Sequence, residues 1–335
     1  MLNDACYRAH IVKMKPMRSV HLENGVVSVR TTARPKLPPG FALIRLLLGG
    51  ICNTDLELQR GYYGFRGVPG HEFVGEVVEA ETPSFIGRRV VGEINLACGH
   101  CEWCARGLGR HCTRRTVLGI VKQPGAFRDF LTLPESNLHE LPKNLPVERA
   151  VFTEPLAAAC EILDQVKIPR GGEVAVLGDG KLGLLIAQVL QAHGARVHQF
   201  GRHRDKLRIS QKAGVTTELA RKRLPTAAYE WTIDATGSPE GLRQAAAMTR
   251  PRGTLIMKST VHGLVPVDTA PLIVNEITLV GSRCGRFEPA LKLLRSGKVN
   301  VDDMISGEFA LSKATEAFER AAEKGVLKVL LRGRG

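Results

Sequence analysis

The sequence predicts an α/β protein in which a β-rich domain is joined to a doubly wound parallel sheet. The chain has 335 residues, which exceeds what one core usually supports and suggests two domains. Residues 10 to 150 contain short β-type runs separated by Gly and Pro turns. From about residue 155, apolar strand patterns alternate with helical patterns, as they do in a parallel sheet.

The strand and helix patterns follow one another in a readable order. In the first half, strands are predicted at residues 41–50, 73–80 and 88–93. In the second half, the alternating patterns are strand 173–178, helix 182–195, strand 196–200, strand 231–237, helix 241–250, strand 253–259 and strand 277–283. The tail carries two amphipathic helical patterns and a final strand, VLKVLL. Periodicity does not decide which domain this tail joins.

The composition indicates an ordinary folded protein with a basic surface. The net charge is +14, which raises the question of a nucleic-acid partner. The basic clusters Arg202-His203-Arg204 and Arg221-Lys222-Arg223 contain no aromatic residues on which bases could stack, so a solvated basic surface is favoured over nucleic-acid binding. No signal-peptide pattern or long apolar run is present, which predicts a cytoplasmic protein without a membrane segment.

The most specific motif is a cluster of four cysteines. Cys98, Cys101, Cys104 and Cys112 are separated by two, two and seven residues. Two-residue spacings can turn thiolates toward one tetrahedral zinc ion, whose shell would then be full, so we predict a structural zinc. Free or disulfide-paired cysteines are the alternative, which a reducing compartment disfavours. An iron–sulfur cluster is a second alternative, although its common spacing differs.

A second group of possible ligands is dispersed in the sequence. Cys52, His71, Glu72 and Glu154 are all residue types that bind zinc. Three protein ligands with one position left for water or substrate would make a catalytic site. Each of these residues taken singly also has an ordinary structural explanation, as a buried small hydrophobe, a core histidine or a solvated carboxylate.

A glycine-rich turn predicts dinucleotide binding. Gly178, Gly180 and Gly183 follow a strand and open a helix, which suits a tight turn, close approach of a pyrophosphate and helix packing. The second strand ends at Gly201, where NAD enzymes place an acidic residue. Because Arg202 and Arg204 follow and can bind a 2′-phosphate, NADP is predicted over NAD. A solvated basic helix start is the alternative.

Together these motifs resemble the zinc-containing medium-chain alcohol dehydrogenases. The order is Cys-x-Thr-Asp at residue 52, Gly-His-Glu at 70, the four cysteines, Glu-Pro-Leu at 154 and the glycine turn, and the similarity spans residues 25 to 331. Glu-Pro-Leu is more similar to the polyol, glucose and threonine dehydrogenase branches. The resemblance implies a GroES-like catalytic domain at 1–153 and 287–335 and a Rossmann domain at 154–286.

The resemblance also implies residue roles. Cys52, His71 and Glu72 would bind the catalytic zinc, with Glu154 as a ligand that exchanges with water. Thr54 would relay the substrate proton, and Asp55 would orient the ligands. Leu182, Lys206 and Thr236 would join Arg202 and Arg204 at the cofactor. Glu57 stands where some relatives place a histidine that passes the proton outward.

The resulting hypothesis is an enzyme with one catalytic and one structural zinc. It would transfer hydride between NADP, or NAD, and a secondary alcohol, polyol or sugar, and it would form a homodimer or homotetramer. The loops at residues 59–67 and 281–287 would select the substrate. A zinc-free quinone or enone reductase and a non-catalytic NADP-binding protein with only the structural zinc are the alternatives.

Overall fold

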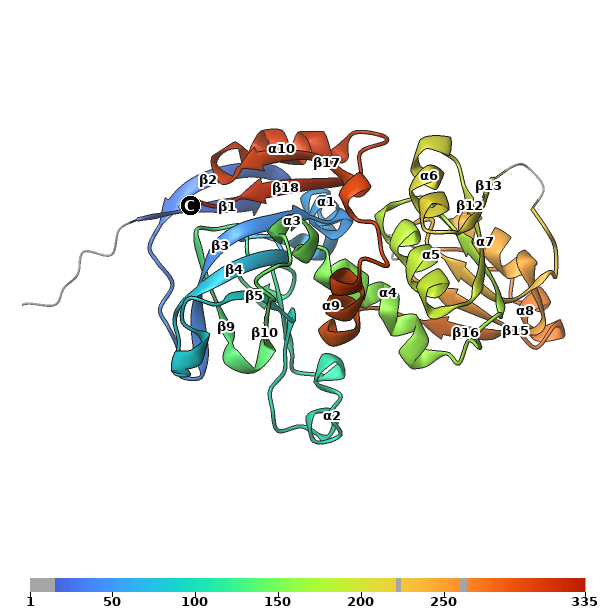
Figure 1. Ribbon diagram of the computed structural model, residues 1–335, viewed down its shortest axis with the longest axis horizontal. Coiled ribbons are helices and arrows are strands. Elements are labelled where there is room, and N and C mark those ends of the chain that lie inside the picture. Colours follow the sequence, from blue (N-terminus) through green and yellow to red (C-terminus); the bar gives the residue numbers. More distant parts are fainter. Residues whose placement is uncertain (1–15, 221–223, 260–263, 335) are drawn as a thin grey trace, which may run out of the picture.

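The protein is described by a computed structural model that covers residues 16–220, 224–259 and 264–334. It is elongated, with a β-rich half at one end and a helix-covered parallel sheet at the other (Figure 1). The predicted combination of a β-rich half with a doubly wound parallel sheet is confirmed by the strand orders given below. Among the described residues, no helix is long and apolar enough to span a bilayer.

The β-rich half is built on one large sheet. Its strands lie in the order β10-β5-β4-β3-β18-β17, and β9 also pairs with β3. The bounds are β3 Phe41–Ile51, β4 Glu72–Glu79, β5 Arg89–Gly92, β9 Phe130–Pro134, β10 Leu138–Glu140, β17 Ile305–Ala310 and β18 Lys328–Arg332. Because β18 pairs antiparallel with β3, the C-terminal tail joins this half, a point that periodicity left open.

Two smaller sheets and a lobe complete this half. Strands β1 (Met17–Glu23) and β2 (Val26–Thr32) form one antiparallel pair, and β6 (Asn95–Leu96), β7 (Thr116–Leu118) and β8 (Lys122–Gln123) form the other small sheet. Between β6 and β7, the chain makes a lobe that contains α2 (Glu102–Ala105) and projects from the body of the protein (Figure 1). Helix α10 (Ala314–Ala322) packs on β2, β17 and β18.

The parallel sheet has the strand order β13-β12-β11-β14-β15-β16. Its strands are β11 Glu173–Leu177, β12 Arg196–Gly201, β13 Thr216–Leu219, β14 Tyr229–Asp234, β15 Thr249–Met257 and β16 Thr278–Gly281. Its helices are α5 Lys181–His193, α6 Arg204–Lys212, α7 Pro239–Met248 and α8 Ala270–Val274. The order reverses between β11 and β14, which is where doubly wound sheets bind ligands. Strand β13 was not predicted because it is short, carries only one apolar residue and has no buried position.

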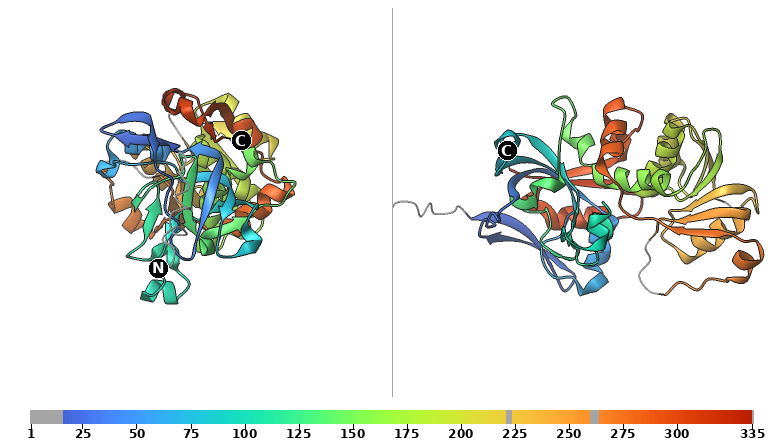
Figure 2. Two further views of the ribbon diagram at one scale, coloured as in Figure 1. Left: turned by 90° about the vertical axis from the view of Figure 1, so that its left-hand side faces the viewer. Right: turned by 90° about the horizontal axis from the view of Figure 1, so that it is seen from below.

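Helices α4 (Thr153–Gln165) and α9 (Phe287–Ser296) join the two halves, with the short helix α3 (Val147–Ala150) beside them. Figure 2, seen from below, shows the β-rich half in blue and teal and the parallel sheet in yellow and orange at opposite ends. One hydrophobic cluster runs through both, from Leu48 and Val74 to Val174 and Ile233. The domain boundaries at 153/154 and 286/287 stay predictions.

Candidate active site and metal centres

Four cysteine sulfurs converge in the lobe between β6 and β7. The Sγ atom of Cys101 lies 3.5 Å from that of Cys104 and 3.7 Å from that of Cys112. The Sγ atoms of Cys98 and Cys104 are 4.0 Å apart. Sulfurs bound tetrahedrally to zinc at about 2.3 Å would lie about 3.8 Å from one another. The four side chains therefore fit one zinc ion, and none of the cysteines in the described part of the chain forms a disulfide.

Backbone donors prepare this loop for thiolate chemistry. The amide of His100 is the main cause that lowers the pKa of Cys98 to about 6, and the amide of Cys104 lowers the pKa of Cys101. Burial raises the pKa of Cys104 to about 11. Metals bind the thiolate form of cysteine. The low pKa of Cys98 favours its thiolate at neutral pH, and a bound metal would displace the protons of the other thiols.

A second cluster joins Cys52 to His71 and Glu72. In the antiparallel pairing of β3 with β4, Gly50 lies opposite Glu72. The chain leaves β3 just after this pair and reaches Cys52, the N-cap of α1 (Asn53–Gln59). One ligand atom from each of the three residues lies within 4.8 Å of the other two. Strand pairing thus assembles ligands that are distant in sequence.

Asp55 lies behind this cluster and is fully buried. Its Oδ2 accepts a hydrogen bond from the amide of Cys52 at 2.9 Å, and its Oδ1 accepts one from the amide of Gly70 at 3.1 Å. Oδ1 also lies 3.5 Å from Nδ1 of His71, a charge contact without hydrogen-bond geometry. Burial by itself lowers the pKa of His71. The nearby Asp55 and Cys52 raise this pKa by more than burial lowers it, so it lies above its usual value. Asp55 ties the two ligand-bearing segments together.

Glu72 is a fully buried carboxylate whose two oxygens have different surroundings. Oε2 forms an ion pair with Nζ of Lys328, which is itself buried at the start of β18. Oε1 has no hydrogen-bond partner among the described residues. An unpaired buried polar atom costs on the order of 1–3 kcal/mol. The donor set of Cys52, His71 and this carboxylate therefore fits a bound cation such as zinc.

Thr54 and Glu154 lie near the edge of the cluster. The Sγ atom of Cys52 is 3.8 Å from Oγ1 of Thr54. Glu154, in the first turn of α4, is not among the three residues whose ligand atoms lie within 4.8 Å of one another. Burial raises the pKa of Glu154, and the charge of His71 lowers it in part. Glu57 pairs with Arg60 at 2.6 Å and is not one of the residues whose ligand atoms converge there.

The glycine turn after β11 has the geometry that a pyrophosphate requires. Gly178 has a φ of +119°, and a Cβ there would come within 2.4 Å of the carbonyl oxygen of Ala235. A Cβ at Gly183 would come within 2.4 Å of the carbonyl oxygen of Gly178, so the helix packs closely on the turn. A Cβ at Gly180 would meet nothing within 4 Å, which leaves open space in front of α5.

This turn borders a cavity at the carboxyl ends of β11, β12 and β14. Its walls include Gly178, Gly180, Arg202 and Thr236. Oγ1 of Thr236 donates a hydrogen bond to Oδ1 of Asp234 at 2.7 Å, which fixes the loop after β14. The cavity lies at the reversal of strand order, where a dinucleotide would bind.

The other predicted cofactor residues occupy different environments. Arg202 and Arg204 are exposed beside the start of α6, and neither side chain forms an ion pair with another described residue. Lys206 is half-buried in the same helix. Leu182 packs against the hydrophobic core, so its side chain serves α5 packing. The second basic cluster, residues 221–223, lies outside the described residues.

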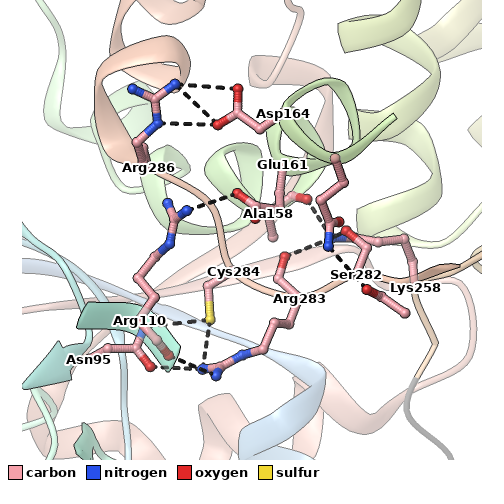
Figure 3. A network of polar contacts seen from close by, with 12 residues as sticks. Asn95, Arg110, Ala158, Glu161, Asp164, Lys258, Ser282, Arg283, Cys284 and Arg286 are labelled. Carbon is pink, nitrogen blue, oxygen red and sulfur yellow. Dashed lines mark hydrogen bonds and ion pairs between the residues drawn. The ribbon is translucent and has the colours of Figure 1, made fainter. Parts of the chain in front are cut away.

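A polar network around Lys258 joins the parallel sheet to α4 (Figure 3). Lys258 is buried just after β15, and its Nζ donates to the carbonyl oxygens of Ala158 and Arg283 at 2.5 and 2.7 Å and to Oγ of Ser282 at 3.1 Å. Burial lowers the pKa of Lys258 to about 8. The three acceptors hold this amine between α4 and the segment after β16.

The same network reaches the cysteine lobe through Arg283. Its guanidinium donates to Oδ1 of Asn95 at 2.7 Å and to the carbonyl oxygen of Arg110 at 3.1 Å (Figure 3). Arg110, in the lobe, in turn lies 3.3 Å from the carboxylate of Glu161 on α4. The lobe is therefore connected to the helix that carries Glu154.

Sequence reasoning missed several charged residues at these sites. Lys328 and Lys258 stand inside apolar strand patterns, VLKVLL and TLIMKS, and a lysine in such a pattern is the signal that could have found them. Asp179 occupies the second position of the glycine turn, beside the cavity. Its signal is an acidic residue in the turn combined with glycine at position 201.

Comparisons with known proteins agree with this geometry. The family model for the alcohol dehydrogenase GroES-like domain matches residues 38–143, and the model for zinc-binding dehydrogenases matches residues 182–296. The chain is 29% identical over 336 residues to a sorbitol dehydrogenase of Halalkalibacterium halodurans, covering 93% of this chain and 98% of that one. It is 32% identical over 325 residues to an L-threonine 3-dehydrogenase of Streptomyces avermitilis, covering 89% and 93%.

A solved structure is similar along nearly its whole length. It is a protein of Sinorhizobium meliloti 1021, solved as a zinc-binding dehydrogenase bound to NADP, with a TM-score of 0.87 and 27% identity. The match covers 95% of this chain and 99% of that one. The similarity therefore includes both halves and the tail.

Proposed function

Because this chain belongs to the family of zinc-type medium-chain alcohol dehydrogenases, we propose that it transfers hydride between an alcohol and a nicotinamide dinucleotide at a zinc ion. The observation that carries the proposal is the convergence of Cys52, His71 and Glu72, with one carboxylate oxygen unpaired. The substrate class proposed is a secondary alcohol, a polyol or a sugar. The similarity to a sorbitol dehydrogenase supports this class.

The residues of the cluster would have different roles in metal binding and proton transfer. Cys52, His71 and Glu72 would hold the metal, and Glu154, farther away on α4, would serve as a ligand that exchanges with water. When bound, zinc supplies a Lewis acid for the substrate oxygen and the dinucleotide takes up the hydride. The hydroxyl of Thr54 would accept the proton of the substrate hydroxyl.

Two buried charges support the ligands. Asp55 bonds the amides on both sides of the site and would keep the ring of His71 oriented. Lys328 offsets the charge of Glu72 in a region from which water is excluded. Burial by itself lowers the pKa of Lys328. Glu72 and Cys52 raise this pKa by more than burial lowers it, so the amine stays protonated. The four cysteines of the lobe would bind a second, structural zinc.

For the dinucleotide, the proposal follows the glycine turn and its surroundings. The open space at Gly180 would admit the pyrophosphate, and Arg202 and Arg204 offer exposed guanidinium groups to a 2′-phosphate. We therefore keep NADP as the favoured cofactor and NAD as the alternative. The NADP bound to the similar Sinorhizobium protein supports this order.

The test measures metal content per chain together with turnover. Purified protein is assayed for zinc and for absorbance of the reduced nicotinamide with NADP or NAD and a panel of polyols, aldoses and secondary alcohols. Two zinc ions and turnover support the proposal. One zinc without turnover favours a non-catalytic binding protein, and turnover with an enone but no alcohol favours a zinc-free reductase.

We also propose that the chain forms a homodimer, with a homotetramer as the alternative. Strand β16 ends the order of the parallel sheet and pairs only with β15 among the described strands. Leu279 on this strand and Ile273 and Val274 on α8 are exposed. An uncovered apolar edge strand is a template for pairing with another chain. Light scattering after gel filtration tests this, and a Leu279→Lys variant should dissociate.

A further inference from the structure

Asp179 occupies the space above Gly201 at the end of β12. A Cβ built on Gly201 would lie 2.6 Å from Cβ of Asp179 and 2.8 Å from its Oδ2. The two positions therefore cannot both carry side chains without movement. In NAD enzymes the acidic residue that binds the ribose comes from the end of this strand. Here the carboxylate in that place comes from the glycine turn.

The carboxylate of Asp179 is held in place by three donors. Its Oδ2 accepts hydrogen bonds from the amide of Arg202 at 2.7 Å and the amide of His203 at 2.6 Å. The ring Nδ1 of His203 lies 3.0 Å from the same oxygen. Successive backbone N–H groups of this kind form an anion-binding site. Asp179 is thus an internal anion that fills it.

The second oxygen of Asp179 remains available. The residue is only 8% exposed, and no described residue donates a hydrogen bond to Oδ1. Asp179 nevertheless borders the cavity that also contains Gly178, Gly180 and Thr236. A ribose hydroxyl in this cavity could donate to Oδ1, whereas a phosphate would meet a like charge.

The neighbouring arginines act in the opposite direction. Arg202 and Arg204 would attract a 2′-phosphate, and glycine at 201 leaves room for one. Judged by these residues alone, the site favours NADP. Asp179 adds a negative charge at the wall of the cavity. It also accepts hydrogen bonds from the amides of Arg202 and His203, which are then not free to bind a phosphate.

We propose that Asp179 weakens the preference for NADP over NAD, by accepting a hydrogen bond from the 2′-hydroxyl of NAD and opposing the 2′-phosphate of NADP. The inference rests on the proposed function only in that a dinucleotide binds in this cavity. It limits the NADP preference that Arg202 and Arg204 create, and it keeps NAD usable.

The experiment compares two nucleotide fragments and the two cofactors. Affinities for 2′,5′-ADP and 5′-AMP are measured by calorimetry on wild type and Asp179→Asn, followed by kcat/KM for NADP and NAD. In Asp179→Asn the ratio of 2′,5′-ADP to 5′-AMP affinity, and the NADP to NAD ratio, should each rise at least about tenfold, because a full charge beside the phosphate is removed. Arg202→Gln should lower both ratios.

Asp205→Asn is the matched control. It removes the same charge from the first turn of α6, where the exposed Asp205 pairs with Arg208 at 3.1 Å, and it should change the ratios less than about twofold. Unchanged ratios in a folded Asp179→Asn protein, or equal losses for both fragments, overturn the inference. If that variant does not fold, Asp179→Ser is judged by the same criterion.

The binding measurement separates this inference from the proposed function. A rise in the 2′,5′-ADP ratio in protein that turns over no alcohol supports the role of Asp179 and contradicts the dehydrogenase proposal. Alcohol turnover with unchanged affinity ratios in Asp179→Asn supports the dehydrogenase proposal and contradicts the role of Asp179. Failure of wild type and variants to bind either fragment overturns the inference, because the cavity would then not be a nucleotide site.

Discussion

The two ligand clusters of this protein differ in how the chain builds them. The four cysteines lie between residues 98 and 112, on one projecting lobe, and all four sulfurs face one point. Cys52, His71 and Glu72 come from two segments that meet only because β3 pairs with β4. The first cluster is local and chemically uniform, and the second is assembled by the sheet from three kinds of donor.

Their surroundings differ as well. His71 and Glu72 are buried with Asp55 and Lys328, whereas three of the four lobe cysteines are half-exposed. A full shell of thiolates suits a structural ion, because no position remains for a substrate. A mixed shell backed by buried charges suits chemistry, because those charges can orient ligands and handle protons. The comparison predicts different functions for two clusters that both have donor atoms suited to zinc.

The sharpest way to break this comparison is to remove one ligand from each cluster. Cys52→Ser should reduce kcat/KM at least about 1000-fold, because the Lewis acid is lost, while the melting temperature changes by only a few degrees. Metal analysis should fall from two zinc ions to one.

Cys104→Ser should show the opposite pattern. It should also lose one zinc, but the melting temperature should fall by at least about 5 °C while activity at low temperature stays within tenfold of wild type, because a structural ion contributes folding energy. The distinction fails if both variants lose activity and stability equally.

Asp55→Asn tests whether the buried carboxylate behind Cys52, His71 and Glu72 positions these candidate ligands. The amide should keep one oxygen acceptor but lose the charge that faces His71, so zinc affinity or kcat/KM should fall about 10–100-fold. Zinc titration and steady-state kinetics measure this. Asp129→Asn, which breaks a partly buried ion pair with Arg18, is the control and should affect stability more than activity. Wild-type kinetics in Asp55→Asn would contradict the role.

Lys258 tests the network between the two clusters through its pH dependence. Burial lowers the pKa of this amine to about 8 in the folded protein, and its usual value is about 10.5. The unfolded chain thus holds the proton to higher pH, so the folded state gains stability as pH rises from 8 to 10.5, by up to roughly 3 kcal/mol. Lys258→Met should lack this gain in denaturant titrations at several pH values. Parallel pH profiles would contradict it.

Glu57 is expected to have the smallest effect. It forms a half-exposed pair with Arg60, and by the family resemblance it stands where some relatives place a proton-relaying histidine. Because such surface pairs contribute about 0–1 kcal/mol, Glu57→Gln should change kcat less than about threefold. Stopped-flow traces across pH measure this against Glu316→Gln, on the exposed face of α10, as control. A tenfold loss would place Glu57 on the proton route.

Much of the fold could be predicted from local patterns. The strands at 41–50 and 73–80 and the helix at 182–195 are long and strongly periodic, so the structure reproduces them within a few residues as β3, β4 and α5. Short elements such as β13 could not be predicted, since four residues with a single apolar side chain and no buried position carry no periodic signal.

The candidate site was predictable to a different degree in each part. The cysteine lobe and the glycine turn are local motifs whose geometry follows from spacing. The proximity of Cys52 to His71 required the family resemblance, because spacing alone does not specify the register of β3 against β4. The roles of all these residues stay predictions until the variants are measured.

By itself, the sequence determined the β-rich half and the parallel-sheet half, the four-cysteine lobe and the glycine turn. Each of these features depends on residues that are neighbours along the chain. Only the tertiary structure decided that the tail enters the first sheet, that Lys328 pairs with Glu72, and that Asp179 lies over Gly201. The physical reason is that these contacts join residues far apart in sequence. Strand register and packing select such partners, and no local propensity encodes them.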